Sequence, residues 1–152
     1  MNTPNQPDPT NQPNQPQPNQ ASAPQQPQPQ PLNEEGLLKS YNFRPQWEVT
    51  PRQVQAMREN GEEFVLVDCR TQAEYDVAKI EGAELVPLKE MADRNDHLEE
   101  WSSRKIIIHC HHGMRSLQMT AMLREQGFGD VWSMAGGIDL WARDIDKDMK
   151  RY

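Results

Sequence analysis

The chain has 152 residues, a formal net charge of −7 at neutral pH and 35% hydrophobic side chains. This length favours a single domain with an extension. No basic stripe accompanies the acidic balance, which argues against nucleic acid and anionic membranes as partners. The aliphatic runs are too short to span a bilayer, and the first residues lack the basic start and apolar core of a signal peptide. We therefore expect a cytoplasmic, reducing setting and no membrane partner.

The extension lies at the N-terminus. Met1 to Asn33 consists almost entirely of Asn, Gln, Pro, Ala, Ser and Thr, holds ten of the thirteen prolines and has one charged residue, Asp8. Such a segment buries too little apolar surface to offset the entropy lost on ordering. We predict a disordered Pro/Gln/Asn-rich tail over residues 1–36 and a folded domain over residues 37–152. The tail is expected to be a flexible tether, with a proline-rich ligand for an SH3-type partner as the alternative.

The remaining chain alternates strands with helices. Short apolar runs predict strands at residues 47–49, 64–67, 84–88, 106–108 and 131–134. Helices are predicted at residues 51–60, after 71, and at 96–101, 117–126 and 138–142. Thr50 and Thr71 are the expected N-caps, Thr71 in a capping box with Glu74, while Gly61 and Gly127 end helices. This order predicts an α/β domain with a mainly parallel sheet and helices on both faces.

One cysteine stands at a position suited to chemistry. Cys110 follows the predicted strand 106–108 and opens the loop Cys-His-His-Gly-Met-Arg-Ser, and reactive groups of open α/β sheets lie beyond the carboxyl ends of strands. Gly113 lets the backbone curl so that amide groups point at the sulfur. The following helix N-terminus and the cation of Arg115 add positive charge, so all three features favour a thiolate. The alternative is a cysteine buried for packing alone.

Three ordered blocks resemble the rhodanese-like domain family. They are Leu66-Val67-Asp68-Cys69-Arg70 with Glu74-Tyr75, then Ile106 to Cys110 with Gly113, Arg115 and Ser116, and finally Gly127-Phe128 with Val131 and residues 135–142. The resemblance implies a three-layer α/β/α domain with a mainly parallel, about five-stranded sheet. It implies a sulfurtransferase in which Cys110 takes a sulfane sulfur from thiosulfate or a persulfide and passes it to a thiol or cyanide-type acceptor. No metal or organic cofactor is expected.

The resemblance also suggests roles for residues around Cys110. Residues of the active loop are expected to bind substrate, namely His111, His112, Gly113, Met114, Arg115 and Ser116. Asp68 and Arg70 are expected to brace this loop, and a simple surface pair is the alternative. Cys69 stands where the family has a small apolar residue, so packing is favoured over a resolving thiol. Adjacent histidines point in different directions, which disfavours a metal site.

Two departures from the family leave substrate and class open. Residues 78–83 differ from the usual Gly-His-Ile-Pro-Gly-Ala turn, and His111 and His112 replace the Arg and Lys of some thiosulfate users. A persulfide relay that docks to one persulfidated protein partner is therefore a second hypothesis. The loop from Cys110 to Arg115 has six residues, whereas related phosphatases and arsenate reductases have one more. This length favours sulfur transfer over phosphatase activity.

Overall fold

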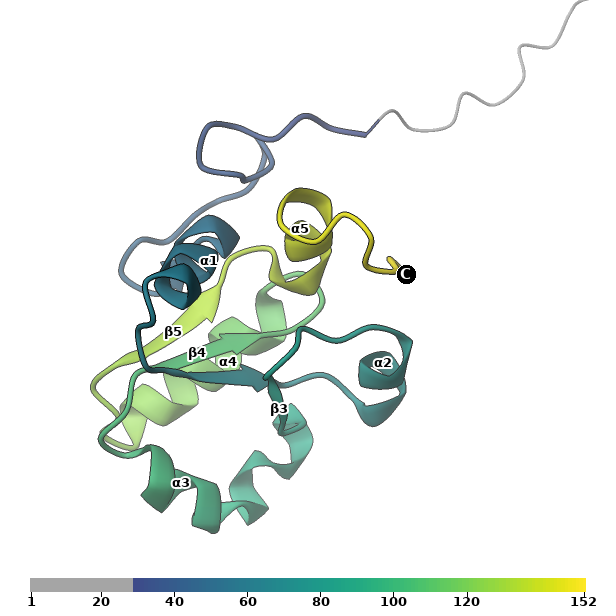
Figure 1. The fold of residues 1–152 in the computed structure, drawn as a ribbon. Coiled ribbons are helices and arrows are strands. Elements are labelled where there is room, and N and C mark those ends of the chain that lie inside the picture. Colours follow the sequence, from purple (N-terminus) through teal and green to yellow (C-terminus); the bar gives the residue numbers. More distant parts are fainter. Residues whose placement is uncertain (1–28) are drawn as a thin grey trace, which may run out of the picture.

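The computed structural model describes residues 29–152, and its core is a five-stranded sheet (Figure 1). The strands of this described part are β1 (Glu48–Val49), β2 (Val65–Asp68), β3 (Glu84–Leu85), β4 (Ile106–His109) and β5 (Val131–Met134). Their order across the sheet is β1-β5-β4-β2-β3, and every neighbouring pair runs parallel. The predicted α/β class with a parallel sheet is confirmed.

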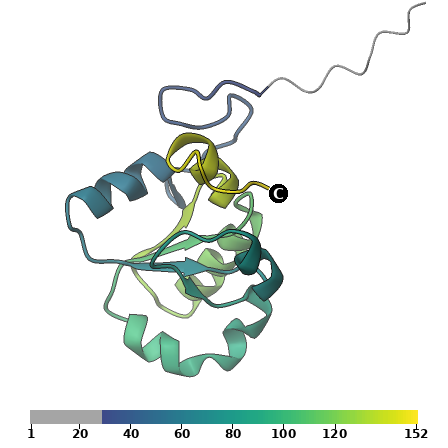
Figure 2. The ribbon, with the colours of Figure 1, turned by 45° about the vertical axis from the view of Figure 1, so that its right-hand side comes forward.

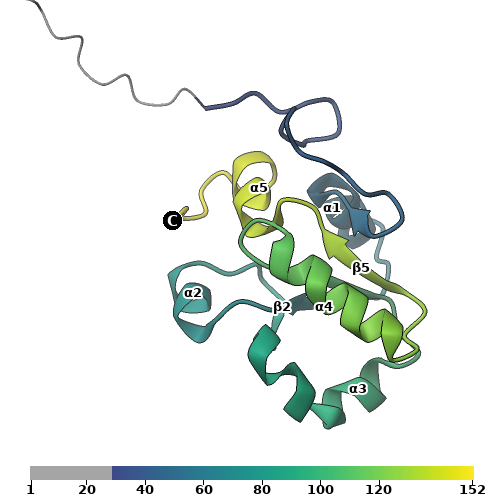
Figure 3. The ribbon, with the colours of Figure 1, turned by 180° about the vertical axis from the view of Figure 1, so that it is seen from behind.

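Helices cover both faces of the sheet, which gives three layers (Figures 1 and 2). The helices are α1 (Pro51–Glu59), α2 (Gln72–Val77), the 3-10 helix η1 (Leu88–Asp93), α3 (Asn95–Trp101), α4 (Met114–Glu125) and α5 (Gly137–Asp144). One core cluster joins the sheet to η1, α3 and α4, and another joins its opposite face to α1 and α5. Figure 3 shows α4 lying across the first of these faces. The first three residues of β2 and of β4 are apolar because both faces of these strands are buried.

The expected helix starts are confirmed at two threonines. Thr50 accepts a hydrogen bond from the N–H of Gln53 at 3.2 Å, and the Gln53 side chain accepts one from the N–H of Thr50 at 2.8 Å. Thr71 and Glu74 make the same reciprocal pair at 3.3 and 3.1 Å, as the sequence pattern predicts. This capping box fixes the start of α2 and, with it, the position of the Glu74 carboxylate.

Two boundaries differ from the prediction by three residues. β3 ends at Leu85 instead of residue 88, because Pro87 has no N–H for the sheet and the chain turns there into η1. Helix α4 begins at Met114 instead of residue 117, with Gly113 as its N-cap at a left-handed φ of 109°. Met114, Arg115 and Ser116 therefore belong to the first turn of a helix and not to a loop.

Both ends of the described chain pack on the domain. Leu32 forms a bridge with Leu38, and Arg52 donates to the carbonyl of Glu34 at 2.6 Å, so these contacts begin upstream of residue 37. The predicted tail lies mostly outside the described residues. The C-terminal segment runs from α5 toward α2 and ends at Tyr152 (Figures 1 and 3). Within residues 29–152, no helix is both long and apolar enough to cross a membrane.

Candidate active site around Cys110

Cys110 lies directly after β4, the central strand of the sheet, and its side chain is buried. The N–H of Gly113 points at the sulfur, with the nitrogen 3.1 Å from Sγ. The hydroxyl oxygen of Ser116 is 3.5 Å from the same Sγ. The left-handed conformation of Gly113 makes this possible, since it turns the chain tightly between the strand and α4. Donors from the loop and from the first turn of α4 thus converge on one sulfur atom.

These donors shift the protonation equilibrium of the thiol. The pKa of Cys110 falls from its ordinary value of 9.0 to about 4, first because the thiol of Cys69 forms a hydrogen bond with it. Burial of the sulfur acts in the opposite direction, and the hydroxyl and N–H of Ser116 and the N–H of Gly113 lower the pKa further. At neutral pH Cys110 is therefore a thiolate, which is the nucleophilic form of cysteine.

Cys69 is the neighbour of Cys110 across the sheet. Its N–H donates to the carbonyl of His109 at 3.0 Å, and its side chain is buried. The hydrogen bond to Cys110, followed by burial, raises the pKa of Cys69, so Cys69 keeps its proton while Cys110 is ionised. The side chain does pack in the core, as expected, in the same cluster as Cys110. Both cysteines directly follow a predicted strand, and this shared position was the sequence signal that they are neighbours.

Arg115 extends from the first turn of α4 toward α2. Its two terminal nitrogens donate to the two carboxylate oxygens of Glu74, each at 2.7 Å. This pairing is the first cause of a strongly lowered pKa for Glu74 and of a raised pKa for Arg115. The guanidinium is expected from the sequence to support the sulfur directly, whereas the structure directs its hydrogen bonds to Glu74.

Asp68 and Arg70 form an ion pair with fully buried side chains, so the surface-pair alternative is wrong. The Nε and Nη2 atoms of Arg70 lie 2.9 and 2.6 Å from the two Asp68 oxygens. The guanidinium also donates to the backbone carbonyls of Glu74 and Ala78, at 3.2 and 2.7 Å. The pair therefore holds the middle and the C-terminal end of α2 next to the site. The ring of His109 lies 3.7 Å from Asp68, and burial lowers the pKa of His109, which keeps the ring neutral.

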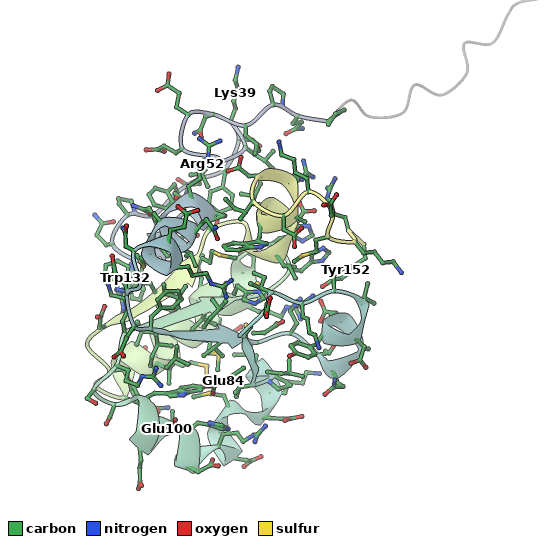
Figure 4. All side chains as sticks on the ribbon, in the orientation of Figure 1. Lys39, Arg52, Glu84, Glu100, Trp132 and Tyr152 are labelled. Atoms are coloured by element: carbon green, nitrogen blue, oxygen red, sulfur yellow. The ribbon has the colours of Figure 1, made fainter. Side chains whose placement is uncertain are left out.

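Tyr152 was not predicted as a site residue. Its hydroxyl accepts a hydrogen bond from Arg70 at 2.6 Å and donates to Glu74 at 3.3 Å, and its ring stacks on His111 with centroids 4.1 Å apart. Figure 4 shows this side chain between the end of α5 and α2. The pairs Arg70–Tyr152 and Glu74–Tyr152 join positions 82 and 78 residues apart. No local sequence signal could have placed the phenol there.

The rim of the site carries His111, His112 and Met114. The two imidazole rings stack with centroids 3.8 Å apart, and Met114 is 73% exposed. His111, His112 and Asp139 have potential metal-ligating atoms within 4.8 Å of one another. The carboxylate of Asp139, however, already accepts hydrogen bonds from Arg143 and Arg151, both at 2.9 Å, so a cation would meet two guanidinium groups. The expectation that the adjacent histidines point in different directions is wrong for His111 and His112, because their rings stack.

The first turn of α5 binds the backbone of the loop that begins at Cys110. The N–H groups of Ile138 and Asp139 donate to the carbonyls of Cys110 and His111, at 2.9 and 3.1 Å. A Cβ atom at Gly137 would overlap both of these carbonyl oxygens. The backbone of α5 therefore passes close to this loop, and the close approach requires glycine at residue 137.

Two pockets meet at Arg115. One has a volume of about 230 Å³ and is lined by residues 69–72 and 87–90 together with Arg115. The other, of about 520 Å³, is lined by Arg44, Trp47, Met114, Arg115, Leu117, Gln118 and Ala121. The smaller pocket includes Cys69, the neighbour of Cys110 across the sheet, and is therefore the candidate route to the Cys110 sulfur.

Comparison with known proteins agrees with this geometry. A model of the rhodanese-like domain matches residues 50–144. The thiosulfate sulfurtransferase GlpE of Pseudomonas fluorescens is 39% identical over 95 residues, which span 61% of this chain and 82% of that protein. The probable adenylyltransferase/sulfurtransferase MoeZ of Mycobacterium tuberculosis is 31% identical over 105 residues, which cover 68% of this chain. This match spans only 26% of MoeZ, about a quarter of its length.

Solved structures give the same result. The rhodanese-like domain of an Anabaena protein superposes with a TM-score of 0.57 at 27% identity, covering 63% of this chain and 73% of that one. The loop after β4, the parallel sheet and the family match over residues 50–144 all point the same way. The chain therefore belongs to the family of rhodanese-like domains.

Proposed function

We propose that this chain is a rhodanese-type sulfurtransferase that carries sulfane sulfur as a persulfide on Cys110. The observation that carries the proposal is the convergence of the Gly113 N–H, the Ser116 hydroxyl and the Cys69 thiol on one sulfur, which lowers the pKa of Cys110 to about 4. Relatives named as sulfurtransferases support the same activity. The names of these relatives describe their own substrates, so the sulfur donor and the sulfur acceptor of this chain are part of the proposal.

In the first half-reaction the Cys110 thiolate attacks the outer sulfur of thiosulfate or of a persulfide. The sulfur–sulfur bond of the donor breaks, and sulfite or a thiolate leaves with the electron pair. The outer sulfur of the new Cys110 persulfide carries the negative charge. Peptide N–H groups of the loop and of the first turn of α4 stabilise this charge, since they are fixed before the reaction begins.

In the second half-reaction a thiol or cyanide attacks the outer sulfur of the persulfide. The bond between the two sulfurs breaks, and Cys110 leaves as a thiolate, which its low pKa makes a good leaving group. No metal or organic cofactor is required for either step. The enzyme returns to its starting state after each acceptor, so the kinetics are ping-pong.

The remaining residues have supporting roles in this proposal. His111, His112 and Met114 form the rim that a donor or acceptor meets, and Arg115 borders both pockets next to it. Asp68 and Arg70 act as positioning residues because their buried pair holds α2. Two buried free thiols also favour a reducing compartment, which supports a cytoplasmic location.

A persulfide relay that docks to one protein partner is the second candidate. The observation favouring it is the larger pocket beside the site, which includes the exposed side chains of Met114 and Trp47. A protein partner could cover such an apolar surface, whereas thiosulfate would not. Transfer from a persulfidated protein would then be fast, and turnover of thiosulfate with cyanide would be slow.

The test compares wild type with Cys110→Ser. We expect wild type to form thiocyanate from thiosulfate and cyanide with parallel-line ping-pong plots, and to gain about 32 Da, one sulfur atom, on Cys110 before acceptor is added. Cys110→Ser should do neither. A persulfidated cysteine desulfurase as donor separates the relay from the small-donor enzyme. Phosphatase turnover without any sulfur adduct would overturn the proposal.

A further inference from the structure

Cys69 and Cys110 occupy matching positions at the ends of two neighbouring strands. β2 and β4 pair in parallel register with Asp68 opposite His109, so the next residue of each strand is a cysteine. The hydrogen bond from the N–H of Cys69 to the carbonyl of His109 continues the pairing to this point. Neighbouring strands lie about 4.8 Å apart, and disulfides join Cα atoms about 4.4–6.8 Å apart. The backbone spacing therefore suits a disulfide.

The two side chains also point to the same face of the sheet. Alternate residues of β2 and β4 belong to one core cluster, which contains Val65, Val67, Cys69, Ile106, Ile108 and Cys110. The residues between them, Leu66 and Ile107, belong to the cluster on the opposite face. Both thiols are free and buried, and each is the first cause of the other's pKa shift. The strand register and the shared face of the sheet therefore place the two side chains next to each other in the reduced protein.

Cys69 also borders the pocket of about 230 Å³ that opens between residues 69–72, residues 87–90 and Arg115. A small anion released at the two sulfurs therefore has a route to solvent. Arg115 and Lys89 line this route together with Glu90, and Arg115 is paired with Glu74. The structure thus combines two adjacent thiols with an exit for a small leaving group.

We propose that Cys69 is a resolving thiol for the Cys110 persulfide, an inference that rests on the proposed sulfurtransferase function. The sulfur of Cys69 attacks Sγ of Cys110 and gives its proton to the departing group. The bond between Sγ and the outer sulfur breaks, and the outer sulfur leaves with the electron pair as hydrosulfide. A Cys69–Cys110 disulfide remains, and an external dithiol reduces it while becoming a disulfide itself.

The electron balance of these reaction steps defines a further activity. The sulfane sulfur gains two electrons, and the dithiol supplies them. Formation of the persulfide moves the negative charge from Sγ of Cys110 to the outer sulfur, so Sγ becomes an electrophile that the neighbouring Cys69 can attack. The enzyme would release hydrosulfide when a dithiol is present and no sulfur acceptor reaches the site.

The test loads full-length protein with sulfur from thiosulfate or from polysulfide and then removes the donor. In wild type we expect release of one hydrosulfide per loaded Cys110, with the mass falling to about 2 Da below that of the reduced protein. A peptide map should show Cys69 joined to Cys110. In Cys69→Ser, and in Cys69→Ala as a second variant, we expect the persulfide to survive about tenfold longer or more. Addition of dithiothreitol should restore both thiols in wild type.

The outcomes separate the two proposals. Persulfide that persists equally in wild type and Cys69→Ser overturns the resolving role and leaves the sulfurtransferase intact. Hydrosulfide released at the same rate by both proteins overturns it as well, because Cys69 would not be the attacking group. Failure of Cys110 to take up sulfur from either donor overturns the proposed function and the resolving role together.

Discussion

Arg115 and Glu74 form a two-point ion pair, with each terminal guanidinium nitrogen 2.7 Å from a carboxylate oxygen. The pair joins the first turn of α4 to the capping box of α2, since Glu74 also accepts from the N–H of Thr71 at 3.1 Å. The positive charge nearest the active loop is therefore largely balanced by a carboxylate. This arrangement predicts that anion binding at the site is limited by Glu74.

Replacing that carboxylate with an amide should strengthen donor binding. In Glu74→Gln the side chain still caps α2, because glutamine serves at this position of a capping box, but Arg115 loses its opposing charge. We expect the KM for thiosulfate to fall about threefold or more, with kcat little changed. Glu63→Gln, at an exposed position before β2, removes the same charge as a control. An unchanged or higher KM in Glu74→Gln would contradict this account.

The reactivity of Cys110 should depend on pH in a defined way. Because its pKa is about 4, alkylation by iodoacetamide should be nearly constant from pH 6 to pH 8 and should fall only as pH approaches that value. Cys69→Ala removes the donor that lowers the pKa of Cys110 most, so the midpoint should move to higher pH. Cys69→Ser keeps a donor and should move it less. A wild-type midpoint above pH 8 would remove the basis of the proposed mechanism.

The buried ion pair predicts a stability effect. Asp68→Ala leaves the buried guanidinium of Arg70 without its counter-charge, so we expect a loss of about 3–5 kcal/mol in the free energy of unfolding. Urea unfolding monitored by circular dichroism measures it. Glu62→Gln is the matched control, because it breaks the exposed pair with Lys105, whose atoms lie 3.6 Å apart. Equal losses of unfolding free energy in Asp68→Ala and Glu62→Gln would show that burial of an ion pair does not determine how much it stabilises the fold.

A methyl group at Gly137 tests the support of the active loop. Gly137 and Gly61 both have left-handed φ values, of 59° and 70°. A Cβ at Gly61 meets nothing within 4 Å, whereas one at Gly137 overlaps the carbonyls of Cys110 and His111. Gly61→Ala should therefore cost only the conformational strain, about 1–2 kcal/mol. Gly137→Ala should lose more stability and most of the sulfur transfer, and similar values for both variants would refute the close contact.

The sequence predicted the elements that depend on local pattern. The apolar runs of β2 and β4 and the capping box at Thr71 are short-range signals, and the structure confirms them. The start of α4 was predicted three residues late, because the left-handed turn at Gly113 allows the helix to begin at once. The pattern of helix-forming residues does not show that Gly113 adopts a left-handed φ angle.

The contacts of the candidate site were harder to predict. Arg115 and Glu74 are 41 residues apart, and Tyr152 and Arg70 are 82 apart. Such pairs follow only from the relative placement of α2, α4 and the C-terminal segment. The contact of Cys69 with Cys110 was in principle predictable, since both residues directly follow predicted strands, but it required the pairing order of the sheet.

The hold of α5 on the active loop has a consequence for protein engineering. Because the carbonyls of Cys110 and His111 face α5, the planar trans peptide groups turn the N–H groups that follow them to the opposite side. Hydrogen bonds to α5 thus fix the backbone of the loop after β4, so this backbone cannot rearrange to fit new substrates. Attempts to change donor preference have their best prospects in the side chains of His112 and Met114, which can vary while the peptide framework stays fixed.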